Sequence, residues 1–154
     1  MLSIVLQTED NSKNGECNLT PEFTAHERRL LANIPEIDLA EMAAELSIAV
    51  PLQIDRVSLG AKCLVALAQM ARTEGLPFSR FDRGDLEELS PSELKALANL
   101  CGYPPSINGM LKAGKKVYKI WQRNRPRSPI ALLLPTFLTP LARFAASQDP
   151  SETS

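Results

Sequence analysis

Hydrophobic residues recur every three or four positions along most of the chain, and this spacing predicts helices rather than strands. Prolines and glycines separate the periodic stretches into short segments. The pattern therefore predicts an all-α fold: a compact bundle of five to six short helices with a basic C-terminal helical hairpin, residues 91–122. The helical domain is expected to cover residues 20–127. Residues 1–19 are predicted to be a flexible arm, and residues 147–154 a disordered tail.

Polar caps mark the predicted helix starts. Thr20 with Pro21, or Thr24 with Glu27 one turn later, begins a helix that ends near residue 33. Asp38 is expected to cap residues 39–46. A cap at residue 55 begins the helix 56–73, which is apolar over most of its circumference and is predicted to be the centre of the bundle. A further cap is expected at residue 82, and the two phenylalanines of the preceding loop, residues 78 and 81, are expected to close the base of the core.

The stretch from residue 90 to residue 127 carries the clearest local signals. Ser90 and Glu93 form a capping box around a proline, and Gly102 is placed to end that helix. Ser106 caps the next helix, residues 107–122. Its apolar positions recur at helical spacing and include Tyr118 and Trp121, which are predicted to be core residues first.

Residues 128–146 are apolar and contain three prolines, which are expected to break the segment into short helices and so to exclude a membrane-spanning helix. Ser128 with Pro129 and Thr139 with Pro140 are the expected starts. One interpretation is that this proline-punctuated segment folds back onto the core. The other is that it docks on a second copy of the chain or on a protein partner, through four residues on one helical face: Phe137, Leu138, Leu141 and Phe144.

Length and composition fit a single domain of 154 residues. The N-terminal residues lack the basic and apolar regions of a signal peptide. The three cysteines have no CxxC spacing and are expected to be reduced thiols. These features favour a cytoplasmic protein with no membrane partner.

The near-zero net charge conceals a division along the chain. Residues 1–93 hold eight Lys and Arg against sixteen Asp and Glu, whereas residues 94–148 hold nine Lys and Arg and no carboxylate. Such a split indicates an anionic partner, or a surface that meets the acidic half of the same chain or of a neighbouring one.

The sequence contains no pattern typical of an active site. It has no glycine-rich phosphate loop and no nucleophile elbow, and its single histidine, His26, lies among charged residues. Acidic pairs such as Asp82 and Asp85 are common at helix starts, where they favour the positive end of the dipole. We therefore expect no enzymatic activity, no metal site and no cofactor.

The helix after Ser106 is the main candidate for a binding site. Lysines at positions i, i+3, i+4 and i+7 can follow a phosphate backbone, and arginines can grip phosphates with two hydrogen bonds. Two residues near the preceding loop, Tyr103 and Asn108, are candidates for finer recognition. The predicted phosphate-binding strip consists of Lys112, Lys115, Lys116, Lys119, Arg123, Arg125 and Arg127. A merely solvated face and a contact with an acidic protein are the competing interpretations.

Residues 86–109 resemble the helix–extended-loop–helix nucleic-acid-binding modules of the SAP and Rho amino-terminal type. The matching positions are Leu89, Glu93-Leu94-Lys95, Gly102, Pro104 and Gly109. The resemblance implies binding of DNA or RNA through the second helix and the loop before it. The second helix is longer here than in those modules, and the loop has extra residues.

Two functions follow from the sequence. The first is a small non-enzymatic nucleic-acid-binding or regulatory protein. The alternative is an interaction or adaptor protein whose acidic and basic halves meet in trans and whose apolar C-terminal segment buries against a partner or a second copy.

Overall fold

A computed structural model describes residues 21–148, and this part of the chain contains no strand but seven α-helices and one short 3-10 helix. The all-α prediction is confirmed, although the helices outnumber the expected five to six. The predicted arm and most of the predicted tail lie outside the described residues. The elements are α1 (Ala25–Asn33), α2 (Glu36–Glu45), α3 (Arg56–Glu74), η3 (Arg80–Asp82), α4 (Arg83–Glu87), α5 (Pro91–Cys101), α6 (Ile107–Asn124) and α7 (Pro129–Gln148).

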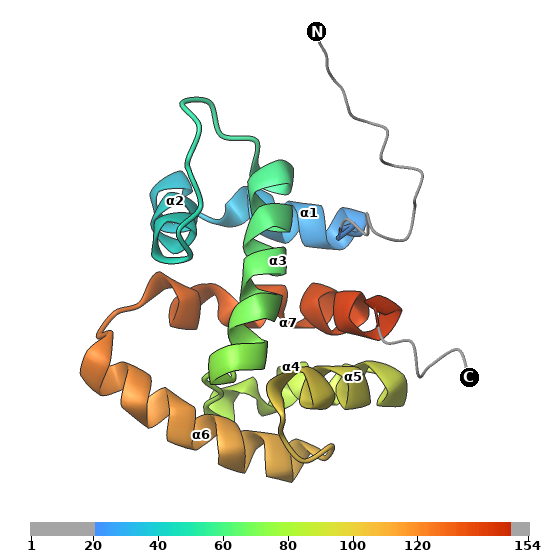
Figure 1. The fold of residues 1–154 in the computed structure, drawn as a ribbon. Helices are drawn as coiled ribbons and strands as arrows, with labels where there is room; N and C mark the ends of the chain where they lie inside the picture. Colours follow the sequence, from blue (N-terminus) through green and yellow to red (C-terminus); the bar gives the residue numbers. More distant parts are fainter. Residues whose placement is uncertain (1–20, 149–154) are drawn as a thin grey trace, which may run out of the picture.

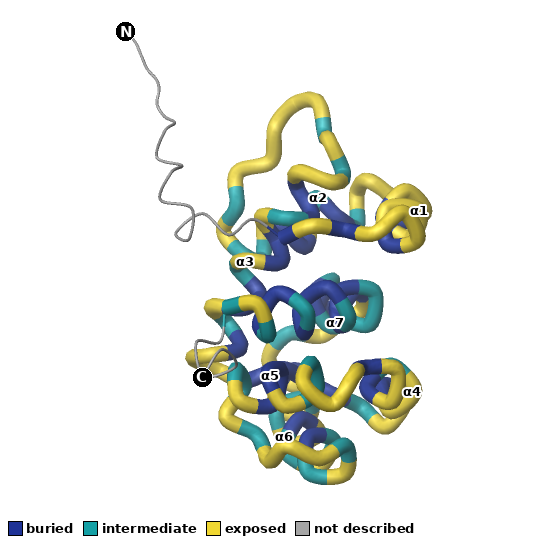
Figure 2. Tube along the Cα trace, turned by 90° about the vertical axis from the view of Figure 1, so that its right-hand side faces the viewer, coloured by how far each residue is buried: buried dark blue, intermediate teal, exposed yellow. Residues whose placement is uncertain are grey.

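The helices form three tiers. α1 and α2 make the upper tier, α7 the middle one, and α4, α5 and α6 the lower one, while α3 crosses all of them (Figure 1). Turning the molecule shows α7 enclosed between the other two tiers and largely buried (Figure 2). α7 packs against α1, α2, α3, α4 and α5. α7 is therefore at the centre of the bundle together with α3, which packs against α1, α2, α5 and α7, so the predicted central helix shares that position with α7.

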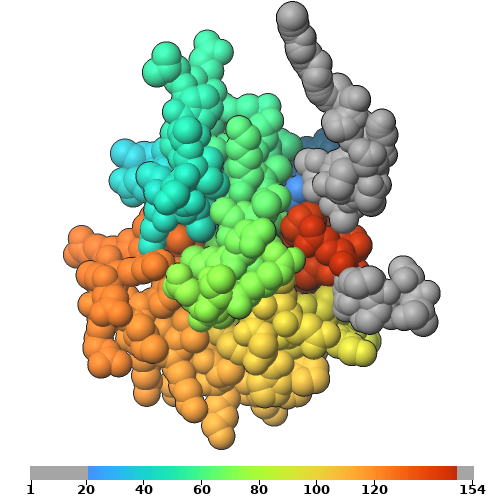
Figure 3. All heavy atoms as spheres, in the orientation of Figure 1, coloured from blue at the N-terminus to red at the C-terminus, as the bar shows by residue number. Residues whose placement is uncertain are grey.

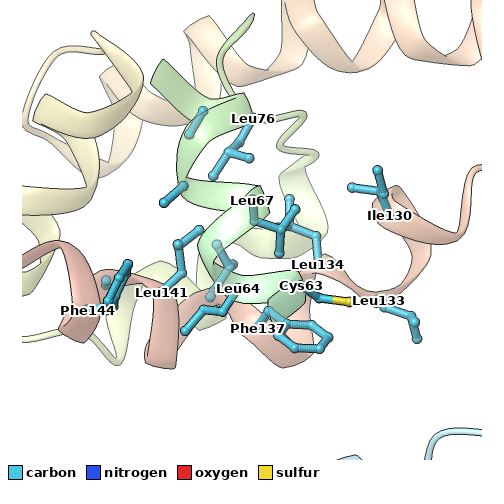
Figure 4. Close-up of a cluster of buried hydrophobic side chains, with 14 of the residues drawn as sticks. Cys63, Leu64, Leu67, Leu76, Ile130, Leu133, Leu134, Phe137, Leu141 and Phe144 are labelled. Atoms are coloured by element: carbon cyan, nitrogen blue, oxygen red, sulfur yellow. The ribbon is translucent and has the colours of Figure 1, made fainter. Parts of the chain in front are cut away.

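The apolar C-terminal segment is one continuous helix with Pro135 and Pro140 inside it. The prediction that these prolines divide the segment is wrong. The four residues considered for a partner contact lie in the core of this chain, where Phe137, Leu138 and Leu141 are fully buried and Phe144 is 6% exposed. Side chains of α7 and α3 interdigitate there (Figure 4). The segment has thus folded back onto the core, as the first interpretation held.

α7 is the one helix, within residues 21–148, that is long and apolar enough to cross a membrane. Length and composition are weak evidence, because the core helix of a soluble protein passes the same test, and 56% of the apolar window of α7 is buried inside this fold. The reason for expecting no such helix, the three prolines, does not hold.

Several predicted caps are confirmed. Thr24 forms a capping box with Glu27, so α1 starts at the later of its two predicted phases. Asp55, Ser90 and Ser106 each accept hydrogen bonds from backbone N–H groups at the starts of α3, α5 and α6. Gly102 ends α5 in the left-handed conformation with φ 73°.

Other predicted caps are wrong. α2 begins after Pro35 without a side-chain cap, so Asp38 lies inside the first turn. Asp82 does not cap α4 but closes a capping box with Ser79 around η3. By contrast, the predicted start at Ser128 and Pro129 is confirmed, since α7 begins at Pro129, whereas the predicted start at Thr139 and Pro140 is wrong because both residues lie inside α7. The Ser128 hydroxyl donates to Glu45 of α2, at 2.8 Å, and the same carboxylate accepts from the N–H of Ile130, at 3.4 Å.

The predicted basic hairpin of α5 and α6 is not seen as a packed pair. α5 packs mainly against α7 and α3, whereas the principal neighbours of α6 are α4 and η3. α6 is fixed to the fold by Phe78, which is fully buried: its N–H donates to the carbonyl of Gly114 at 3.1 Å. The second phenylalanine of that loop, Phe81, is 83% exposed, so the prediction that it closes the core is wrong.

Candidate functional site

α6 presents two different faces. Its inner face carries the three buried residues of the helix, Met110, Gly114 and Trp121, and Gly114 lies against Phe78. Its outer face is exposed and carries the lysines at i, i+3, i+4 and i+7. The basic face, as we name it, consists of Lys112, Lys115, Lys116, Lys119 and Arg123, and every one of these side chains is exposed.

No residue of the basic face forms an ion pair within the described part of the chain. Arg127, which follows α6, is likewise exposed and has no ion pair there. A surface helix usually intersperses charges of opposite sign, which support one another at i,i+4 spacing. The basic face carries no carboxylate, so its cations remain free to meet an external anion.

Arg125 has a different role from its neighbours. Its guanidinium lies 3.5 Å from Glu45 of α2 and 3.7 Å from Glu74 of α3, and it stacks 4.4 Å from the centre of the Trp121 ring. These contacts tie the end of α6 to the ends of α2 and α3. Arg125 is therefore a structural residue, and the prediction that it belongs to the phosphate-binding strip does not fit its contacts.

A second arginine of the basic half is also paired within the chain. Arg143 of α7 contacts Glu27 of α1 through both of its terminal nitrogens, at 2.6 and 3.1 Å, and donates to the carbonyl of Glu22. Burial alone would raise the pKa of Glu27, but the hydrogen bonds from Arg143 and Thr24 outweigh it and hold that pKa below its ordinary value. The acidic and basic halves thus meet in cis, through two of the nine cations of residues 94–148.

Tyr103 is occupied by the fold. Its hydroxyl accepts from the N–H of Leu76 at 2.9 Å and donates to the carbonyl of the same residue at 2.8 Å. Its ring meets Phe78 edge-on, with the centroids 6.0 Å apart. Burial raises the pKa of Tyr103 to about 12. This side chain fixes the loop after α3 and is not placed to read a ligand.

Asn108 remains at the surface. It lies in the first turn of α6, and its side-chain oxygen accepts a hydrogen bond from Arg83 of α4. Among the described residues no group of three or more His, Cys, Asp or Glu could hold a metal ion.

The structure adds a groove that the sequence analysis missed. It runs between η3, α6 and the start of α7, and consists of two adjoining hollows of about 520 and 300 Å³. Figure 3 shows an opening between α6 and the beginning of α7. Ser79, Phe81, Tyr118 and Gln122 line both hollows. The smaller hollow also contains Lys115 and Lys119, so the groove is continuous with the basic face.

Phe81 lines this groove because of the conformation of η3, the short turn to which it belongs. The N–H of Ser79 donates to Asp82 at 2.7 Å, and the N–H of Phe81 donates to the Ser79 hydroxyl at 3.2 Å. This capping box fixes η3 and directs the ring outward. The spacing of Ser79 and Asp82 is visible in the sequence and signals a turn, but it does not show which side of the turn faces solvent.

Comparisons with protein-family models, with curated proteins and with solved structures found no match for this chain. The fold and the surface chemistry therefore define the protein only as a small helical bundle with a basic helix at its edge. The resemblance of residues 86–109 to SAP and Rho amino-terminal modules stays a prediction.

Proposed function

We propose that this protein binds nucleic acid without catalysing a reaction, and that the basic face of α6 contacts the phosphates. One observation carries the proposal: five exposed cations lie on one side of a single helix, with no carboxylate among them and no ion pair within residues 21–148. A rigid helix holds these charges in a fixed row, as recognition of a phosphate backbone requires.

The length of the row suits this role. From Lys112 to Arg123 the axis of α6 advances by roughly 16 Å at the usual helical rise. One nucleic-acid strand places about five phosphates along that distance in the B form. Five cations therefore face about five phosphates, which is enough for binding that depends steeply on salt.

The energetics of the isolated helix argue against a merely solvated face. Lys112 with Lys116, and Lys115 with Lys119, are like charges at i,i+4 spacing, and each such pair destabilises a helix by about 0.2–0.5 kcal/mol. The row therefore costs stability, and within the described residues no carboxylate offsets it. Binding to an external polyanion accounts for this arrangement.

Pairing of the two halves between chains is less well supported. Arg125 and Arg143 already pair with Glu45, Glu74 and Glu27 inside the chain. The apolar residues proposed for the same adaptor function lie in the core. Folding thus accounts for the apolar segment and for two of the nine cations that suggested an adaptor.

Charge reversal on the basic face tests the proposal. Fluorescence anisotropy with labelled duplex DNA and single-stranded RNA measures binding by the wild-type chain and by Lys115→Glu/Lys119→Glu. The matched control is Lys62→Glu/Lys95→Glu, which changes the net charge equally at two exposed lysines on α3 and α5. We expect binding to be lost in the first variant and weakened far less in the control. Equal weakening in both variants, or no binding by the wild type at low salt, would contradict the proposal.

A further inference from the structure

Phe81 contributes almost nothing to the core, since 83% of it is exposed, yet it is held on a turn closed by two hydrogen bonds. A single exposed apolar residue is ordinary in a folded protein. Phe81 is not isolated, however, because it shares a groove with Tyr118 and with Leu132, which is 67% exposed. These three residues make an apolar floor beside the basic face.

Cations surround this floor. Arg80, Lys115 and Lys119 border the smaller hollow, and Arg125 and Arg127 border the larger one. The guanidinium of Arg80 lies 5.6 Å from the centre of the Phe81 ring. The single carboxylate in the lining, Asp82, is 7% exposed and accepts a hydrogen bond from the Ser79 N–H. The occupant must therefore combine negative charge with flat or apolar groups.

We propose that the groove binds single-stranded nucleic acid, with an unpaired base stacked on Phe81 while the neighbouring phosphates meet the basic face. This inference rests on the function proposed above and specifies its ligand. Bases in a duplex are stacked on one another, so an exposed ring reaches a base face only where the strand is unpaired. Sequence-tolerant single-strand binders combine this same pair of features, a cationic track and aromatic platforms.

The continuity of the groove with the basic face favours this ligand over an acidic peptide. Lys115 and Lys119 belong both to the basic face and to the smaller hollow, so the phosphate track leads directly to the ring. Gln122 lies beside Phe81 in both hollows and offers an amide donor and acceptor to a base edge. An acidic peptide would need the cations but would have no particular use for a flat ring with a guanidinium over it.

The test compares the same labelled oligonucleotide, of about twelve nucleotides, as a single strand and as a duplex. Wild type, Phe81→Ala, Phe81→Tyr and Ile120→Ala are titrated by anisotropy. Ile120 is an exposed apolar residue of α6 that does not line the groove, so its variant controls for loss of apolar surface. Phe81 is too exposed for its truncation to threaten folding.

We expect the single strand to bind more tightly than the duplex, and Phe81→Ala to weaken single-strand binding at least about fivefold. Phe81→Tyr and Ile120→Ala should leave it nearly unchanged. Trp121, the only tryptophan, lines the groove, and its emission should fall when an unlabelled strand binds. Duplex binding should respond to Lys115→Glu/Lys119→Glu but not to Phe81→Ala.

Two results would overturn the inference and leave the proposed function standing: equal affinity for both forms, or single-strand binding that survives Phe81→Ala while Lys115→Glu/Lys119→Glu abolishes it. Displacement of the strand by an acidic, leucine-containing peptide at a lower concentration than unlabelled strand requires would overturn the inference in favour of a peptide ligand. Absence of binding to either nucleic acid at low salt would overturn the inference together with the proposed function.

Discussion

α6 and α7 are consecutive helices of similar length, with 18 and 20 residues, but α7 lies at the centre of the fold and α6 at its edge. α7 buries ten residues and touches five other helices, whereas α6 buries three and leaves its outer side to solvent. A helix that is apolar on all sides occupies the centre wherever it falls in the chain. A strongly two-sided helix stays at the edge and leaves its polar face in solvent.

The comparison also shows how two prolines are tolerated in a central helix. Each interior proline costs about 3 kcal/mol through a lost hydrogen bond and a clash with the preceding turn. α7 buries seven large apolar side chains, and each stabilises the fold by about 1.5–3 kcal/mol. Burial therefore outweighs the two prolines, and the helix continues through them.

The largest expected effect distinguishes two leucines of α7. Leu134 is 1% exposed and Leu132 is 67% exposed. We expect Leu134→Ala to lower the free energy of unfolding by about 2–5 kcal/mol, because it leaves a cavity in the core. Leu132→Ala should change it by less than about 0.5 kcal/mol. Urea denaturation followed by circular dichroism measures both, and similar losses would refute the central position of α7.

A smaller effect tests the inner face of α6. A methyl group on Gly114 would lie 2.6 Å from Cβ of Phe78, whereas one on Gly84 of α4 would meet nothing within 4 Å. Gly114→Ala should therefore destabilise the protein by about 1–3 kcal/mol through overpacking. Gly84→Ala should stabilise it by about 0.4–1 kcal/mol. Thermal denaturation shows whether each variant is more or less stable than wild type. A more stable Gly114→Ala variant would mean that α6 does not pack against Phe78.

A third effect, the smallest of the three on stability, concerns the ion pair that joins α7 to α1. Glu27→Gln keeps an acceptor for the Thr24 cap but removes the charge facing Arg143. Because the pair is partly exposed, we expect a loss of about 1 kcal/mol near neutral pH. The pKa of Glu27 in the folded protein lies below its ordinary value. The stabilisation from this charge is therefore complete at pH values above the pKa of Glu27 in the unfolded chain. It is lost as the pH falls through the pKa of Glu27 in the folded protein.

Urea denaturation near pH 7 and again near pH 3 should show the difference between wild type and Glu27→Gln shrinking in acid. Glu36→Gln is the control, because Glu36 is exposed and forms no ion pair with another described residue. A difference that is the same at both pH values would show that the charge on Glu27 does not contribute.

Local signals in the sequence predicted local structure well. The caps at Asp55, Ser90 and Ser106 depend on side chains that bond within their own turn, so a short stretch of sequence contains the cause. The same holds for the two-sided pattern of α6. The continuous helix at residues 129–148 could not be predicted in this way, because the burial that outweighs its prolines comes from α1 to α5.

The candidate site was predictable only in part. The exposed lysines follow from spacing alone. The roles of Tyr103 and Arg125 depend on partners 27 or more positions away, Leu76 for the first and Glu45 and Glu74 for the second. The sequence placed Phe81 in the core, whereas the ring is exposed. Its exposure depends on how α6 and α7 lie around the turn of η3, and a local sequence pattern does not contain that information.

The most direct test of the account is the salt dependence of nucleic-acid binding with the outer face of α6 intact and altered. The logarithm of the association constant for a duplex is measured against the logarithm of the salt concentration for wild type, Lys115→Gln/Lys119→Gln and Lys62→Gln/Lys95→Gln. Each cation that meets a phosphate contributes about 0.9 to the slope. We expect a slope smaller by about two in the first variant and unchanged in the second. Equal slopes for all three proteins would contradict the claim that α6 keeps this face for phosphates.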